Sequence, residues 1–229
     1  MRKYLIFILM VCFFGLESYA QPKSYFTVRG GYSVTLGEYS SNNYETGAFT
    51  SSGISLGVDG AWFFYKNIGL VADFNYSLHS VDAATLATEI FYAFEDPLLN
   101  NLYVRSDPYK VITFMLGINY NYKLLDKLSI EPRVLSGLLM AYTPFQLIET
   151  EYFILADDYF KKTSSRDQSI AFKAGLSIKY DLSNCLAISL SGDYTTANMS
   201  FGFIGSKGRY YRDQKIAYLD LSFGLVYKL

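Results

Sequence analysis

The chain has 229 residues, a formal net charge of -1 and an aromatic content of 18%, with 22 Tyr and only 5 Pro. Its basic residues are scattered, which excludes the clustered positive surface of a nucleic-acid-binding protein. After the N-terminal segment no window reaches the roughly 18 apolar residues of a transmembrane helix. Cys185 is the single cysteine there, which excludes an internal disulfide. Tyrosine combines an apolar ring with a polar hydroxyl, so its enrichment is typical of proteins that line membrane–water interfaces.

Residues 1–20 have the pattern of a signal peptide. Arg2 and Lys3 form a positive n-region, residues 5–15 are apolar, and the segment ends on the small residue Ala20. We predict cleavage before Gln21, export through the general secretion route and a mature domain of residues 21–229. The alternative, an uncleaved membrane anchor, would need about 20 apolar residues.

Segments with a period of two follow one another along the mature chain. Apolar and aromatic residues alternate with small, polar or charged residues, which predicts β-strands with two different faces. In the last segment the apolar set is Ala217, Leu219, Leu221, Phe223, Leu225, Tyr227 and Leu229. The predicted strands are residues 25–34, 53–64, 68–79, 111–124, 128–142, 170–182, 186–195 and 216–229. Pro132 cannot donate to a ladder, so we expect a bulge in the fifth strand.

The connections between these strands alternate in length. Three are short, at residues 65–67, 124–127 and 182–184, and four are long, at residues 37–51, 81–107, 143–167 and 198–213. Short turns at one end and long loops at the other are typical of transmembrane β-barrels. The sequence therefore predicts an all-β fold, an eight-stranded antiparallel transmembrane β-barrel with short periplasmic turns and long extracellular loops. A secreted β-sandwich or a lipocalin-like barrel is the alternative, because parity alone does not say which face is inside.

The positions of aromatic residues on the apolar face support the membrane interpretation, because they predict two girdles at the membrane–water interfaces. The girdle near the short turns contains Trp62, Phe64, Tyr120, Tyr122, Tyr180 and Tyr227. The girdle near the long loops contains Tyr32, Tyr76, Tyr142 and Tyr194.

The polar face collects charged residues of both signs in equal number. The basic residues are Arg29, Lys123, Arg133, Lys173, Lys179 and Lys228. The acidic residues are Asp59, Asp73, Glu131, Asp181, Asp193 and Asp220. The interior of an eight-stranded barrel is just wide enough for side chains, and charges buried there must pair. We predict a lumen plugged by ion pairs; a narrow ion pathway is the alternative.

Residues suited to catalysis are few. His79 is the single histidine, with Ser77 two residues away on the same face and Ser80 next to it, and a barrel enzyme acting on lipid A would need such a histidine to activate a nucleophile. No metal-binding or hydrolase motif occurs. We expect a histidine held by hydrogen bonds at the barrel rim, and neither a catalytic residue nor a cofactor nor a metal.

The long loops are rich in aromatic residues, which predicts either an ordered cap or a binding surface. The second of them has a helical pattern over residues 83–94. Asp82 is suited to the N-cap position, and the apolar residues Leu86 and Ile90 are spaced four apart.

The mature chain resembles the small outer-membrane β-barrel proteins of the OmpA/OmpX-like type and, more narrowly, Bacteroidetes barrels that include those labelled PorT-like. The resemblance rests on Ser18-Tyr19-Ala20-Gln21, on Leu116-Gly117-Ile118 and Ala174-Gly175-Leu176, and on the closing stretch of residues 223–229. It implies a location in the outer membrane of a Gram-negative bacterium. The terminal Leu229 differs from the usual terminal Phe or Trp of such barrels.

From these features we predict a non-enzymatic outer-membrane barrel with a structural or surface-interaction role. An accessory role in outer-membrane protein secretion is the alternative, and a lipid-A-modifying enzyme is the third. The expected partners are outer-membrane lipid, the barrel-insertion machinery during biogenesis, and a protein bound at the extracellular loops or periplasmic turns. No nucleic-acid partner is expected.

Overall fold

A ring of antiparallel strands dominates the computed structural model, which describes residues 22, 24–43, 46–94, 96–153, 158–205 and 208–229. The predicted signal peptide lies outside the described residues. Eight strands form the ring, the fourth in two pieces. They are β1 (Tyr25–Thr35), β2 (Thr50–Tyr65), β3 (Ile68–Val81), β5 (Tyr109–Tyr120) continued by β6 (Tyr122–Leu125), β7 (Leu128–Tyr142), β10 (Arg166–Asp181), β11 (Leu186–Gly205) and β12 (Gly208–Lys228).

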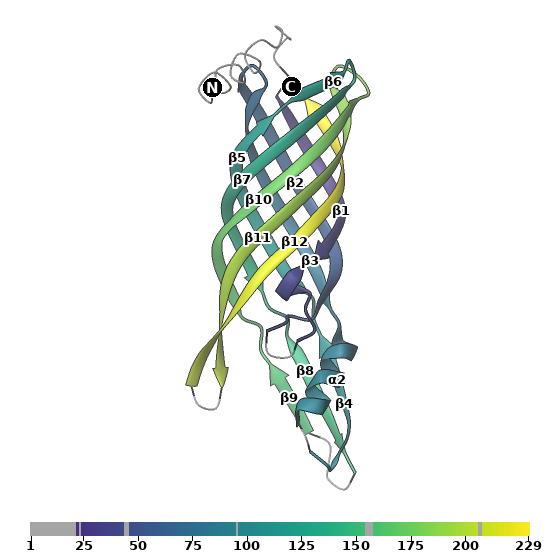
Figure 1. Ribbon diagram of the computed structural model, residues 1–229, viewed down its shortest axis with the longest axis vertical. Coiled ribbons are helices and arrows are strands. Elements are labelled where there is room, and N and C mark those ends of the chain that lie inside the picture. The colour runs from purple at the N-terminus through teal and green to yellow at the C-terminus, as the bar shows by residue number, and fades with distance from the viewer. Residues whose placement is uncertain (1–21, 23, 44–45, 95, 154–157, 206–207) are drawn as a thin grey trace, which may run out of the picture.

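The ring closes between its first and last strands. β1 pairs with β12 over its whole length, from Tyr25↔Lys228 to Thr35↔Tyr218. Figure 1 shows strongly tilted strands, with the C-terminus at the same end as β6 and the short connections. Closure leaves no sheet edge in the ring, and in lipid an open edge would cost several kcal/mol for each unpaired backbone group. The predicted eight-stranded antiparallel β-barrel is confirmed.

The two faces of each strand differ in burial as the parity pattern predicts. Outward residues such as Val28 and Leu225 are 55% and 54% exposed, whereas the inward residues Arg29 and Asp73 are 4% and 1% exposed. The polar set therefore faces the lumen and the apolar set faces outward, which is the arrangement required in lipid. A soluble barrel would show the opposite arrangement.

The last hairpin is longer than predicted. Residues 198–213, expected to be a loop, continue β11 and β12 as paired strands, from Asn198↔Lys215 to Gly205↔Gly208. Met199, Phe201 and Phe203 keep the period of two and are buried. This apolar face packs with the core of the barrel mouth, which stabilises the hairpin beyond the ring.

The bulge expected at Pro132 is not observed, so that prediction is wrong. The register is the same at Asn119↔Arg133 and at Tyr122↔Ile130, on either side of the proline. The neighbouring strand is interrupted instead, between β5 and β6 at Asn121. The amide of Asn121 donates to the carbonyl oxygen of Asn67 at 2.8 Å, so its hydrogen bond is directed to the turn between β2 and β3.

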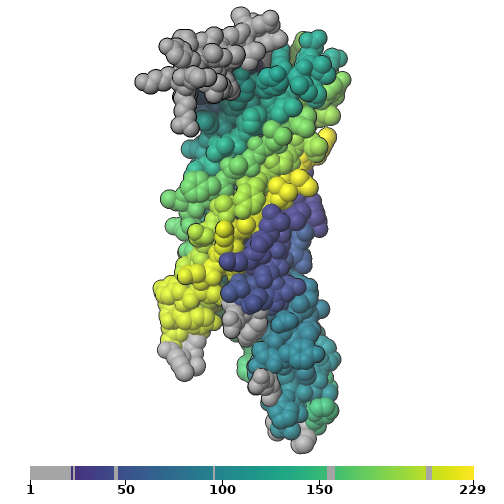
Figure 2. All heavy atoms as spheres, viewed as in Figure 1, coloured from purple at the N-terminus to yellow at the C-terminus, as the bar shows by residue number. Residues whose placement is uncertain are grey.

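A small folded unit stands at the long-loop end of the barrel, and we call it the extracellular subdomain. It consists of α2 (Ala83–Phe94) and a three-stranded sheet in the order β4 (Leu99–Ser106), β8 (Gln146–Tyr152) and β9 (Asp158–Lys162). Its apolar core contains Phe49, Leu86, Ile90, Leu99 and Leu102. Figure 2 shows this subdomain and the outer part of the β11–β12 hairpin, coloured yellow, as two separate projections.

The helix and its start agree with the sequence analysis. α2 spans the predicted residues, and Leu86 and Ile90 are buried. Asp82 accepts a hydrogen bond from the Thr85 amide at 3.1 Å and another from the Thr85 hydroxyl at 2.7 Å. These bonds lower the pKa of Asp82, because they favour the ionised carboxylate. The helix therefore begins at a charged N-cap, as local sequence predicts.

Candidate functional site in the lumen and the extracellular subdomain

The centre of the lumen holds a layer of arginines and aspartates from non-adjacent strands. Arg29 donates to Asp193 at 2.7 Å and also to Asp73, while Arg133 donates from Nε to Asp193 at 2.8 Å. Both guanidinium groups lie 3.6 Å from Asp59. Lys173 completes the layer through an ion pair with Asp73. Each of these charges is compensated by an opposite one, as burial requires.

A glycine provides the space for this layer. A Cβ atom at Gly175 would lie 1.9 Å from Oδ1 of Asp193, closer than any real contact. Gly175 is directly paired with Asp193 on β11, so a larger residue would displace the carboxylate that both arginines share. The central glycine noted in the sequence therefore makes room for an ion pair.

A second layer lies nearer the short-turn end. Glu131 accepts hydrogen bonds from Lys179 at 2.8 Å, from the Tyr25 hydroxyl at 2.8 Å and from Asn121 at 2.6 Å. The ammonium of Lys179 lies 3.0 Å from the centroid of the Tyr25 ring. At the rim, Lys228 pairs with Asp181 at 2.5 Å. Tyr25 and Asn121 were not predicted as site residues. Both share the inward face of their segment with a predicted charged residue, Arg29 for Tyr25 and Lys123 for Asn121.

Two residues that we predicted in the ion-pair network, Lys123 and Asp220, form no ion pair found among the described residues. Lys123 is exposed at the periplasmic mouth. Asp220 accepts a hydrogen bond from Asn75 at 3.1 Å, while its other oxygen has no partner within the described part of the chain. Parity places both residues inward, but the end of β6 is too close to the opening for Lys123 to be enclosed.

Apolar side chains also point into the lumen, whereas a cavity of about 600 Å³ opens at its short-turn end beside Glu131 and Lys179. Val71, Met115, Leu135 and Leu139 are almost fully buried in the lumen, at the level of the central layer and next to it. They belong to the same buried cluster as the base of the long hairpin. The lumen thus contains apolar as well as charged side chains.

His79 lies at the outer end, with both ring nitrogens engaged. Nε2 is 2.8 Å from the Ser33 hydroxyl and Nδ1 is 3.0 Å from the Tyr39 hydroxyl. Tyr39 comes from η1 (Gly37–Tyr39) in the first long connection and is fully buried, and burial raises its pKa well above the ordinary value. Ser77 is bonded to Asn75 instead of His79. A histidine–serine pair at these two positions is therefore absent.

The predicted girdle residues all lie on the outward face. Trp62, Phe64, Tyr32, Tyr122, Tyr180, Tyr194 and Tyr227 are exposed, and Tyr76, Tyr120 and Tyr142 are partly exposed. Exposed aromatic rings on a barrel wall are suited to lipid head-group contact. Their alignment with the two interfaces stays a prediction.

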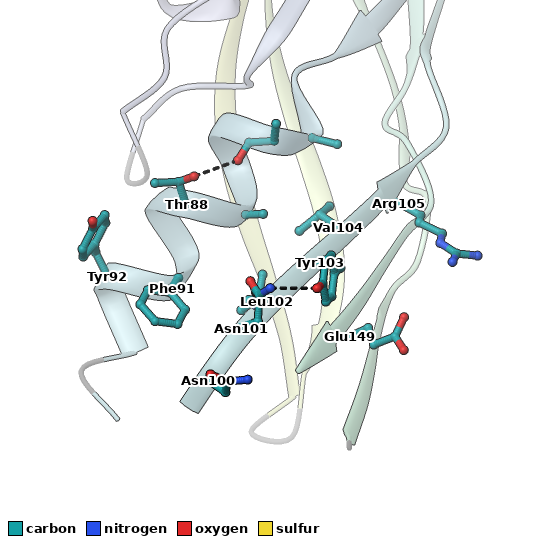
Figure 3. Close-up of a pocket in the computed structure, with 13 residues that line it drawn as sticks. Thr88, Phe91, Tyr92, Asn100, Asn101, Leu102, Tyr103, Val104, Arg105 and Glu149 are labelled. Carbon is teal, nitrogen blue, oxygen red and sulfur yellow. Dashed lines mark hydrogen bonds between the residues drawn. The ribbon is translucent and has the colours of Figure 1, made fainter. Parts of the chain in front are cut away.

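A surface groove of about 810 Å³ lies along α2 and β4 in the extracellular subdomain, on the side away from their shared apolar core. Figure 3 shows Phe91 on α2 facing the side of β4 that carries Asn100 and Asn101, with Glu149 on the neighbouring strand β8. Two hydrogen bonds fix side chains at its border, from Thr88 to the Ala84 carbonyl at 3.0 Å and from Asn101 to the Tyr103 hydroxyl at 2.7 Å. The groove is lined by aromatic rings, by the amides of Asn100 and Asn101, and by the charged side chains of Arg105 and Glu149. It therefore suits a ligand that has both polar and apolar surface.

The described residues contain no group of three or more His, Cys, Asp and Glu side chains arranged to hold a metal ion. Within the same part of the chain, no helix is long and apolar enough to cross a bilayer.

Comparison with known proteins identifies the fold. No protein-family model and no curated protein sequence matches the chain. Among solved structures, it is similar to Neisserial surface protein A, with 10% identity and a TM-score of 0.50, over 90% of this chain and 97% of that one. The outer membrane protein OprG of Pseudomonas aeruginosa gives 12% identity and a TM-score of 0.50, over 91% and 98% of the two chains. A major outer membrane protein of Thermus thermophilus gives 13% identity and a TM-score of 0.50, over 90% of this chain and 99% of that one.

These identities are too low to carry a specific activity from one protein to another, but the likeness spans nearly the whole length of each chain. The closed ring, the polar lumen and the apolar outer wall agree with the same architecture. The chain has the fold of the small outer-membrane β-barrel proteins of the OmpA/OmpX-like type.

Proposed function

We propose that this protein is an outer-membrane barrel with a closed lumen whose function is a non-enzymatic interaction at the cell surface. The observation that carries the proposal is the extracellular subdomain, which has its own apolar core and an open groove between α2 and β4. A barrel with a purely structural role has no need of an ordered, grooved unit so far from the membrane.

The contents of the lumen support the closed state. The central layer joins Arg29, Arg133, Asp73 and Asp193 across strands that are not neighbours, so side chains span the interior. Tyr39 covers the outer end through its hydrogen bond to His79. Moving these groups aside would separate buried opposite charges, which costs several kcal/mol.

The surroundings of His79 support the non-enzymatic part of the proposal. General-base catalysis needs a ring nitrogen within hydrogen-bond reach of a nucleophile or a substrate. Nε2 lies within reach of the Ser33 hydroxyl and Nδ1 within reach of the Tyr39 hydroxyl, but His79, Ser33 and Tyr39 are all fully buried, which leaves no surface on them for a substrate. His79 lies on β3, which is paired with β2 on one side and β5 on the other, so a continuous backbone ladder stands between the ring and the lipid phase there.

Site-specific photocrosslinking tests the surface role. We would place the crosslinking residue at Tyr92 and Tyr103 in the groove, both of them exposed, and at the exposed Lys127 in a periplasmic turn as the control. We expect adducts with surface molecules at the two groove positions. Adducts with secretion components concentrated at Lys127 would contradict the proposal and favour an accessory role in protein secretion.

Membrane fractionation tests the location separately. We expect the chain in the outer membrane, with migration on gels that changes on heating, and with its N-terminus at Gln21. Recovery as a soluble periplasmic protein would contradict this part of the proposal.

A further inference from the structure

The strand β4 lies at the edge of the three-stranded sheet in the extracellular subdomain. The sheet order is β4, β8 and β9, so β4 pairs with β8 on one side, and no strand of the described residues pairs with its other side. The surface groove follows this second side, because residues 100–105 of β4 line it without interruption. Consecutive side chains point to opposite faces of a strand, so such a lining places the groove against the strand edge. Figure 3 shows β4 between α2 and β8, which leaves the free edge on the α2 side.

The hydrogen bonds next to β4 show which of its backbone groups point into the groove. The Asp107 amide donates to the Phe145 carbonyl at 3.0 Å, in the same register as the pairs between β4 and β8. Bonded pairs alternate along an antiparallel ladder, so the odd-numbered residues bond to β8, and Leu102 and Val104 direct their amide and carbonyl groups away from it. The Leu102 amide accordingly donates to Oδ1 of Asn101 at 2.9 Å. Among the described residues, no hydrogen-bond partner is found for the Val104 amide.

The two edge strands of this sheet differ in their protection against pairing with another chain. Proteins blunt exposed edges with very short strands, with lysine or with proline. β9, the opposite edge, has five residues and includes Lys161 and Lys162. β4 has eight residues and contains neither lysine nor proline, and its single register shift lies at its first residues. The part of β4 that lines the groove therefore keeps an edge that is able to pair.

We propose that the free edge of β4 binds an extended segment of a partner polypeptide, which adds to the sheet as a fourth strand. The groove presents amide and carbonyl groups at every second residue of β4, and an extended polypeptide has complementary groups at the same spacing. Neither a glycan nor a lipid has donors and acceptors in this arrangement. The inference rests on the proposed surface function, because it names the class of partner for the same groove.

The side chains around the edge define the chemistry of the bound segment. On the α2 side the wall of the groove includes the small residues Ala84 and Thr88 and the ring of Phe91, which leaves room for apolar side chains of the partner. On the outer face Tyr103 and Arg105 are exposed, and Arg105 forms no ion pair found within the described part of the chain. An acidic residue opposite Arg105 would complement its charge. We therefore expect a segment in which apolar residues alternate with polar ones, one of them acidic.

Selection from a phage-displayed library of linear peptides, panned against the refolded barrel, tests this edge. Val104→Pro removes the amide that points into the groove and leaves the ladder to β8 in place, whereas the control Val104→Ala shortens the same side chain and keeps the amide. We expect the selected peptides to bind the wild type and Val104→Ala alike. Their binding to Val104→Pro should be about tenfold weaker or more, because a backbone hydrogen bond is lost and the proline ring meets the added strand.

A second measurement uses the wild-type protein alone and so covers the case in which Val104→Pro does not refold. Each backbone amide of a selected peptide is N-methylated in turn, and the affinity of each derivative is measured. Strand addition predicts a period of two, because only every second amide of the peptide faces β4. N-methylation at those positions should weaken binding about tenfold, and at the positions between them much less.

Three results would overturn strand addition: no enriched peptide, equal binding to the wild type and Val104→Pro, or an N-methylation profile without a period of two. Self-association of the barrel that Val104→Pro abolishes would assign the edge to a second copy instead. Glycan binding that Val104→Pro retains would assign the groove to a carbohydrate. Photocrosslinks at Tyr92 and Tyr103 separate this failure from failure of the surface function, since crosslinks without peptide binding would leave that function standing.

Discussion

Arg133 donates from Nε to Oδ1 of Asp193 at 2.8 Å across the lumen, although β10 separates their strands in the sheet. Asp193 also accepts from Arg29 of β1 at 2.7 Å. A single carboxylate thus connects three strands that backbone hydrogen bonds do not connect with one another. The cross-section of the barrel is therefore held by side chains as well as by the ladder.

This arrangement makes Asp193 more important for stability than a rim carboxylate. We expect Asp193→Asn to lower the free energy of unfolding by about 3–5 kcal/mol, because it leaves buried arginines without full compensation. Asp181→Asn is the control, since Asp181 and its partner Lys228 have side chains 29% and 19% exposed. Its cost should be about 1 kcal/mol or less. Denaturant unfolding of the refolded barrel measures both, and equal losses would contradict the role of the central layer.

The closed lumen that we propose predicts that the barrel conducts little or no current. Planar-bilayer recording of the wild-type protein should show no steady unit conductance, because side chains span the interior of an eight-stranded barrel. Tyr39→Ala should remain closed as well, since the charged layer lies deeper than the outer contact with His79. A defined wild-type conductance step would refute the closed state. Conductance in Tyr39→Ala alone would place the closure at the outer end.

The outer wall predicts a difference between two exposed apolar residues. Leu225 lies on β12 within the ring, paired with Val28 and Ile188, while Tyr211 lies on the hairpin beyond it. Leu225→Arg should cost about 2–4 kcal/mol if its position is near the bilayer midplane. Tyr211→Arg should change stability by about 0.5 kcal/mol or less, as surface substitutions in water do. Unfolding in lipid vesicles measures the difference, and a neutral Leu225→Arg would show that this position does not face lipid.

The N-cap of α2 predicts a local, pH-dependent effect. Asp82→Ala should destabilise the helix by about 1 kcal/mol, seen as faster hydrogen exchange of the α2 amides with the barrel amides unchanged. The folded pKa of Asp82 is lowered, so its contribution is present above the unfolded pKa and is lost as pH falls through the folded value. Thr88→Ala, within the same helix, should lack this acid dependence, because it removes no titratable group. Identical pH profiles for the two variants would contradict the cap.

The sequence by itself determined the strands of the ring and which of their residues share a face, because a period of two is a local property of each segment. It also determined α2 and its cap, since Asp82 and Thr85 are three residues apart. The signal for the long hairpin is present in Met199, Phe201 and Phe203, which continue the period of two into residues 198–213, where we predicted a loop.

Only the tertiary structure decided which inward charges meet. Parity treats Lys123 and Lys179 alike, yet one is exposed at the mouth and the other bonds Glu131. The tertiary structure also paired β4 with β8, strands from two different loops. Such contacts depend on the tilt and stagger of strands that are not neighbours in the chain. A local pattern contains no information on that geometry, which is set when the ring closes.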